Sequence, residues 1–161
     1  MSIKILSAYN YLKEVTELFA EYTNMLIKRD PAIEEYLNIQ NYTKELEHLE
    51  SKYGLPDGRL YLAYCNGELA GCIGLRKHDE QSCEMKRLYV RPEFRGKHVG
   101  QQLIQQIISD AKDIGYSSML LDTLPFLQSA VHMYKKFGFY EISQYNDNPI
   151  KTSIYMKLEL I

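Results

Sequence analysis

The stretch from Arg91 to Gly100, RPEFRGKHVG, separates two segments of opposite periodicity and thereby decides the fold. Residues 82–90 before it (SCEMKRLYV) have the composition of a β-strand. In residues 99–115 after it (VGQQLIQQIISDAKDIG), apolar side chains recur at helical spacing. The sequence therefore predicts a turn from a strand into a helix that contains two glycines and a pair of cations.

This turn is suited to bind an anion. The first turn of a helix leaves backbone N–H groups without partners, and the helix dipole adds partial positive charge there. Gly96 and Gly100 would let the backbone approach a bulky anion, because neither has a Cβ atom. Arg95 and Lys97 add charge beside it. A tight connection whose cations are merely solvated is the alternative interpretation of the same residues.

Composition limits the classes of protein. With 161 residues, 45% of them hydrophobic and 25% charged, we expect one domain spanning residues 1–161. A net charge of −2 provides no global field for nucleic acid. We find no membrane-length apolar run and no signal peptide, so we expect a cytoplasmic protein without a membrane partner. The three cysteines lack C-x-x-C spacing and the four histidines share no ligand spacing, which predicts reduced thiols and no metal site.

The order of elements predicts an α/β (mixed α+β) fold, with helices on the faces of a mixed sheet. Asn66-Gly67 is the dipeptide favoured in two-residue hairpin turns. The expected strands are residues 2–6, 59–65, 68–77, 82–90, 117–124, 139–143 and 152–160. The expected helices are residues 12–29, a region over 33–54 whose middle is unclear, 99–114 and 128–137.

The segment RGKHVG resembles the acyl-CoA-binding signature of the GNAT superfamily of N-acetyltransferases, [Q/R]-x-x-G-x-[G/A]. His98 replaces the central glycine of that pattern, and histidine tolerates left-handed backbone conformations. The resemblance implies that successive amides of this loop bind the pyrophosphate of coenzyme A. The cofactor-binding residues implied are Leu88, Tyr89, Val90, Arg95, Gly96, Lys97, His98, Val99, Gly100, Gln101 and Tyr134.

The resemblance covers essentially the whole chain. Ala130, Tyr134, Gly138 and Phe139 match the family's A-x-x-x-Y-x-x-x-G-F spacing, although Leu127 stands where many relatives have asparagine. EMKRLYV resembles the family's fourth strand, which diverges from the next one so that the pantetheine arm lies between them. The implied fold is GNAT-like: a central mixed, mostly antiparallel sheet with splayed middle strands and helices on both faces.

The resemblance also implies a function. We expect an enzyme that transfers an acetyl group from acetyl-CoA to a primary amine of a small molecule or peptide, without a metal. A CoA-binding sensor without catalysis is the alternative, and homodimers are frequent in the family. Tyr134 is the implied acid for the departing sulfur. A backbone amide near Val90, where the family's fourth strand bulges, is implied to stabilise the oxyanion.

Glu84 is the candidate general base, because strand alternation would place Glu84, Lys86, Leu88 and Val90 on one face. A solvated carboxylate, or one paired with Lys86 or a neighbouring strand, is the alternative. The loop before the last strand contains two further candidates. Family loops of this kind often shape the acceptor pocket, which makes Tyr145 and Asn148 candidate substrate-binding residues; a plain hairpin turn explains them as well.

Overall fold

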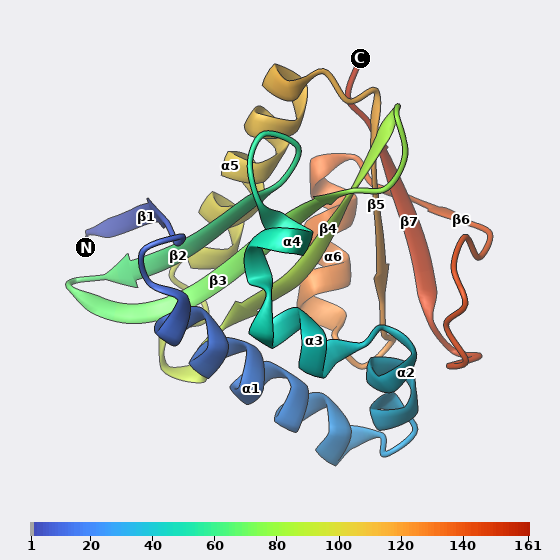
Figure 1. Cartoon of the computed structure of the whole chain (residues 1–161), viewed down its shortest axis with the longest axis horizontal. Helices are drawn as coiled ribbons and strands as arrows, with labels where there is room; N and C mark the ends of the chain where they lie inside the picture. The colour runs from blue at the N-terminus through green and yellow to red at the C-terminus, as the bar shows by residue number, and fades with distance from the viewer. Residues whose placement is uncertain (1) are drawn as a thin grey trace.

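A computed structural model describes residues 2–161 of the chain. Within these residues, seven strands form one sheet in the order β1-β2-β3-β4-β5-β7-β6 (Figure 1). Strands β4 and β5 are parallel and the other five neighbouring pairs are antiparallel. The strands are β1 (Ile3–Ser7), β2 (Arg59–Cys65), β3 (Glu68–Lys77), β4 (Ser82–Val90), β5 (Ser118–Thr123), β6 (Tyr140–Ile142) and β7 (Ile154–Glu159). This order and the mostly antiparallel pairing confirm the predicted fold class.

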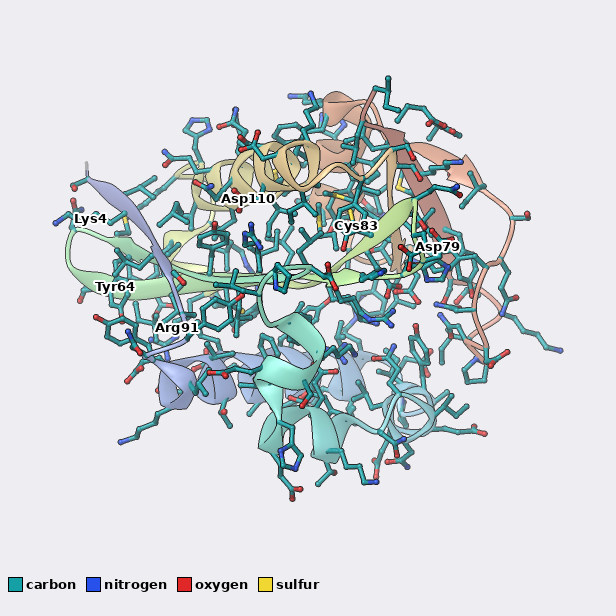
Figure 2. All side chains as sticks on the ribbon, turned by 45° about the horizontal axis from the view of Figure 1, so that its top comes forward. Lys4, Tyr64, Asp79, Cys83, Arg91 and Asp110 are labelled. Carbon is teal, nitrogen blue, oxygen red and sulfur yellow. The ribbon has the colours of Figure 1, made fainter. Side chains whose placement is uncertain are left out.

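Helices cover both faces of the sheet (Figure 1). They are α1 (Leu12–Arg29), α2 (Ile33–Ile39), α3 (Tyr42–Glu47), α4 (Leu49–Tyr53), α5 (Val99–Ile114) and α6 (Gln128–Phe137), with a 3-10 turn, η1 (Pro92–Phe94). Figure 2, in which the sheet is seen nearly edge-on, shows α5 on one side and α1 on the other. Each amphipathic helix thus buries its apolar face against one side of the sheet.

Two of the three apolar clusters in residues 2–161 follow directly from this layering. Leu103 and Ile107 of α5 belong to one cluster, together with Met119 of β5. Leu18 and Phe19 of α1 belong to the other, which contains the β2 residues Leu60 and Leu62. Alternation along the strands sends successive side chains to the two sides. The sheet therefore lies between the α5-side cluster and the α1-side cluster.

Local signals explain where several elements begin and end. Asn66 and Gly67 have φ of 52° and 83°, which confirms the predicted hairpin turn. The unclear region over residues 33–54 consists of three short helices. Asn41, at φ 55°, separates α2 from α3, and His48, with φ −137° and ψ 57°, separates α3 from α4. Neither conformation continues an α-helix.

Strands β4 and β5 diverge, as predicted. Their parallel pairing covers only Ser82–Glu84 against Ser118–Leu120. Beyond that point a cavity of about 60 Å³ is lined by residues 85–88 of β4 and by residues 121–124 at the end of β5. The backbone edge of β4 that faces β5 therefore has no strand partner after Glu84. This opening positions the candidate site.

A β-bulge in β4 contradicts one expectation. The register of β3 against β4 shifts between Cys72 and Gly74, opposite Arg87, whose φ is 60°. The extra residue reverses the alternation. Leu88 and Val90 consequently pack against the α5-side cluster, as does Met85. The prediction that they share a face with Glu84 and Lys86 was wrong. The irregularity also lies at Arg87, before the expected position near Val90.

The three cysteines are buried and free, as predicted. In the part of the chain that the structure describes, no helix is both long and apolar enough to span a membrane.

Candidate active site

The loop before α5 presents a row of unpaired amides. Gly96 has φ 78° and His98 has φ 67°, so the left-handed conformation expected to be tolerated at His98 is present. The first backbone amide of this region that donates within the protein is that of Gln102, to the His98 carbonyl at 3.1 Å. Among residues 2–161, no hydrogen bond is donated by the N–H groups of residues 96–101. Six consecutive donors therefore surround the start of the helix.

The side chains of this loop have different roles. Arg95 and Lys97 are exposed, and Arg95 Nε donates to the Val90 carbonyl at 3.0 Å. A Cβ atom on Gly96 would meet nothing within 4 Å, so its surroundings are open. A Cβ atom on Gly100 would lie 3.2 Å from Met133 Cε. Gly100 thus serves the close approach of α5 to α6, in addition to any approach by a ligand.

The end of β4 is fixed to α1. Tyr89 packs in the α1-side cluster, and its hydroxyl donates to Glu21 Oε1 at 3.3 Å. The next residue, Arg91, binds Glu17 and Glu21 at 2.7 Å each; Figure 2 shows it on the α1 side of the sheet. Leu88 and Val90 point to the opposite side. A ligand between β4 and β5 would meet the backbone of Tyr89 and not its ring.

The bulge is held from α3. Arg87 donates from Nε and Nη2 to the two carboxylate oxygens of Glu45, both at 2.9 Å, and from Nη2 to Gln40 Oε1 at 2.6 Å. Lys52 and the Tyr53 hydroxyl also contact Glu45, at 2.6 and 2.9 Å. Burial alone would raise the pKa of Glu45, but Arg87 and Lys52 outweigh it and hold that pKa at about 2. The left-handed residue therefore sits in a buried ionic network.

Tyr134 meets the diverging strands from α6. Its ring packs in the α5-side cluster beside Phe139, with 5.8 Å between centroids. Its side chain also lines the cavity between β4 and β5. Within residues 2–161 its hydroxyl makes no hydrogen bond. Burial raises the pKa of Tyr134 well above its usual value, so the hydroxyl keeps its proton.

Glu84 is buried and ion-paired. Its Oε1 accepts from Arg76 Nη1 at 2.9 Å, its Oε2 accepts from the Tyr145 hydroxyl, and Lys86 Nζ lies 4.0 Å away. Burial alone would raise the pKa of Glu84, but Lys86, Tyr145 and Arg76 together lower it. Glu84 lines an open groove of about 910 Å³, whereas Tyr134 and Leu88 line the cavity. The ion-paired alternative describes its surroundings; its role as a base stays a prediction.

The two loop residues lie in different places. Tyr145 lines the groove, stacked edge-on against His78 with 5.4 Å between centroids. Asn148 lines the cavity, and its Nδ2 donates to Ser153 Oγ at 2.8 Å. Asn148 Nδ2 is 3.5 Å from Asp122 of β5, whereas the Tyr145 hydroxyl contacts Glu84 of β4. The loop before β7 therefore lines both the cavity and the open groove.

Sequence reasoning missed the charged residues of the cavity itself. Lys86, Arg87 and Asp122 all line it, together with Tyr36 of α2. Asp122 had a usable signal, because it is the one charged residue in the apolar run SSMLLDTL. The sequence indicates Lys86 only as a possible partner of Glu84. Tyr36 had no signal, since its hydroxyl reaches Asp122 from 86 residues away in the sequence.

Comparison with known proteins agrees with this geometry. Residues 13–139 match the acetyltransferase (GNAT) family. An uncharacterised N-acetyltransferase of Dictyostelium discoideum is 34% identical, with 99% of this chain and 100% of that protein covered. Another, from Schizosaccharomyces pombe, is 44% identical over 77% of each chain. The crystal structure of PaiA N-acetyltransferase from Thermoplasma acidophilum, a complex with coenzyme A, aligns with a TM-score of 0.71, at 22% identity over 99% of both chains. The chain therefore belongs to the GNAT family and is an acetyltransferase.

Proposed function

We propose that the protein transfers the acetyl group of acetyl-CoA to a primary amine of a small molecule or peptide, by direct attack in a ternary complex. The observation that carries the proposal is the row of unpaired amides at residues 96–101. Consecutive N–H groups at a helix start bind phosphate groups, because they supply hydrogen bonds and the positive end of the helix dipole. Lys97, exposed beside them, adds charge.

The rest of the cofactor fits the opening between β4 and β5. The pyrophosphate would bind the amides of residues 96–101, with Arg95 close by. The pantetheine arm would lie along Leu88–Val90, where the edge of β4 has no strand partner. Its amides could then hydrogen-bond to that edge as a short strand would. The thioester would reach the bulge at Arg87, where Tyr134 lines the same cavity.

The chemistry needs three groups. The amine nitrogen attacks the thioester carbon, the N–C bond forms and the C–S bond breaks. A backbone amide of the bulge would stabilise the oxyanion. The thiolate of CoA would take the proton of the Tyr134 hydroxyl, which burial keeps protonated. Glu84, ionised because its pKa is lowered, would accept the proton of the amine from the groove side. Glu84 then releases its proton to solvent and Tyr134 regains one from solvent, so protons balance.

The role of Glu84 has its own test. Glu84→Gln should remove the base while keeping a partner for Tyr145 and Arg76. We expect kcat/KM to fall and its acidic limb, which the titration of Glu84 would shape, to change. An unchanged limb would assign the amine proton to water or to another carboxylate of the site.

The amide row is tested with proline. Gln101→Pro removes one N–H that has no partner in the protein, and proline is tolerated in the first turn of a helix. Gln101→Ala is the matched control, because it removes the same side chain and keeps the amide. A charge-assisted hydrogen bond is worth about 1.5–3 kcal/mol, so we expect the proline variant to bind CoA roughly 10- to 100-fold more weakly. Equal Kd values for the two variants in calorimetry would contradict the proposal.

A further inference from the structure

Lys86 is a buried cation without a hydrogen bond. Its side chain is 7% exposed, and its Nζ is 4.0 Å from Glu84 Oε1. That oxygen already accepts a hydrogen bond from Arg76 at 2.9 Å. Among residues 2–161, Lys86 Nζ donates to nothing. A buried ammonium without hydrogen bonds is unfavourable, so an anionic ligand group at this place would be bound strongly.

Asp122 supplies the opposite charge in the same cavity. The hydroxyl of Tyr36 and the amide of Asn146 donate to its Oδ2, the latter at 2.9 Å. Its Oδ1 accepts no hydrogen bond from any residue in the described range 2–161. One oxygen is thus used to fix the carboxylate, and the other is left to a ligand. Asp122 lies on β5 and Lys86 on β4, on the two sides of the opening.

Lys86 and Asp122 are the charged residues of the cavity that remain available to bind a ligand. Arg87 also lines the cavity, but its guanidinium is bound by Glu45 and Gln40. Lys86 lines both the cavity and the open groove, so it stands where the two meet. A ligand entering from the groove would therefore meet Lys86 first and Asp122 beyond it.

We propose that the acetyl acceptor is a small amino acid-like molecule that carries a carboxylate beside its amine. Lys86 Nζ binds the carboxylate, and Asp122 Oδ1 accepts a hydrogen bond from the amine, which directs it towards the thioester at the bulge. The inference rests on the proposed function and names its substrate class. A simple amine or a polyamine would leave Lys86 Nζ without a hydrogen-bond acceptor and add positive charge beside it. Such acceptors are therefore disfavoured in this site.

The test compares acceptors that differ only in the carboxylate. Leucine is paired with 3-methylbutylamine and phenylalanine with phenethylamine, and CoA release is measured for each. The variant Lys86→Met keeps the length of the side chain and removes its charge, while Glu84 keeps its ion pair with Arg76 at 2.9 Å and is not left as an unpaired buried charge. Lys157→Met is the matched control, because Lys157 is also a strand lysine, paired with Glu159 at 3.7 Å and outside both hollows.

For the wild type and for Lys157→Met, we expect kcat/KM to be at least about 10-fold higher for the amino acid of each pair. In Lys86→Met this preference should fall towards one, mainly through a higher KM. Equal kcat/KM within the pairs, or a preference that Lys86→Met leaves intact, overturns the inference.

A binding experiment separates this inference from the proposed function. N-acetylleucine and N-(3-methylbutyl)acetamide are titrated calorimetrically into the CoA-bound protein, which needs no turnover. Tighter binding of the carboxylate compound, weakened about 10- to 100-fold by Lys86→Met, supports the site even if no acceptor of the panel is acetylated. Equal binding of the two compounds overturns it, even if the protein acetylates amines.

Discussion

Replacing Glu45 by glutamine should lower the free energy of unfolding by about 3 kcal/mol at pH 7. The pKa of this carboxyl is lowered from 4.5 to about 2 in the folded protein, and each unit corresponds to about 1.4 kcal/mol. The side chain is only 2% exposed, so solvent screens the interaction little. For a chain of this length the loss corresponds to a Tm roughly 6–12 °C lower.

The stabilisation that Glu45 provides depends on pH. The folded-state pKa lies below the unfolded one, so the stabilisation is complete above about pH 4.5 and is lost as the pH falls towards 2. In urea unfolding, the difference in free energy of unfolding between wild type and Glu45→Gln should therefore narrow by roughly half between pH 7 and pH 3. Glu47→Gln on the same helix is the control, because Glu47 is exposed and should change stability by less than about 0.5 kcal/mol.

Two results would refute the reasoning. A loss below about 1 kcal/mol for Glu45→Gln at pH 7 would mean that Arg87 finds other partners at little cost. If the difference in free energy of unfolding between the two proteins stays constant down to pH 3, the carboxylate charge is not the stabilising element.

Three further outcomes are expected. Tyr134→Phe should lower kcat by about 10- to 100-fold while the KM for acetyl-CoA changes little; a change below twofold in initial rates would exclude the hydroxyl from catalysis. Gly100→Val should weaken both folding, by about 1–3 kcal/mol, and CoA binding, because its side chain would collide with Met133; a wild-type Tm and CoA Kd would contradict this. The buried thiols should not react with Ellman's reagent until urea is added, since burial raises the pKa of Cys83 to about 12 and that of Cys72 further; rapid reaction in the native state would show that they are accessible.

Local patterns predicted most of the fold. The hairpin at Asn66-Gly67 and the entry into α5 depend on the conformations of a few adjacent residues, and sequence shows these directly. The bulge at Arg87 could not be predicted in this way. An arginine with positive φ is unfavourable by itself and is kept in place by Glu45, 42 residues earlier in the chain. The charged residues of the cavity could not be predicted for the same reason: Asp122 acquires its partner Tyr36 only when β5 and α2 come together in the fold.

The short pairing of β4 with β5 has a consequence for the dynamics of the free protein. After Glu84, β4 has no strand partner on the side that faces β5, although it lies in the middle of the sheet. In the free protein, the backbone N–H groups on that side of β4 can therefore hydrogen-bond only to solvent. Deuterium should enter these positions readily in the absence of CoA and slowly in its presence. In the proposed complex the donor molecule would thus fill the gap between β4 and β5 and complete the hydrogen bonding of the sheet.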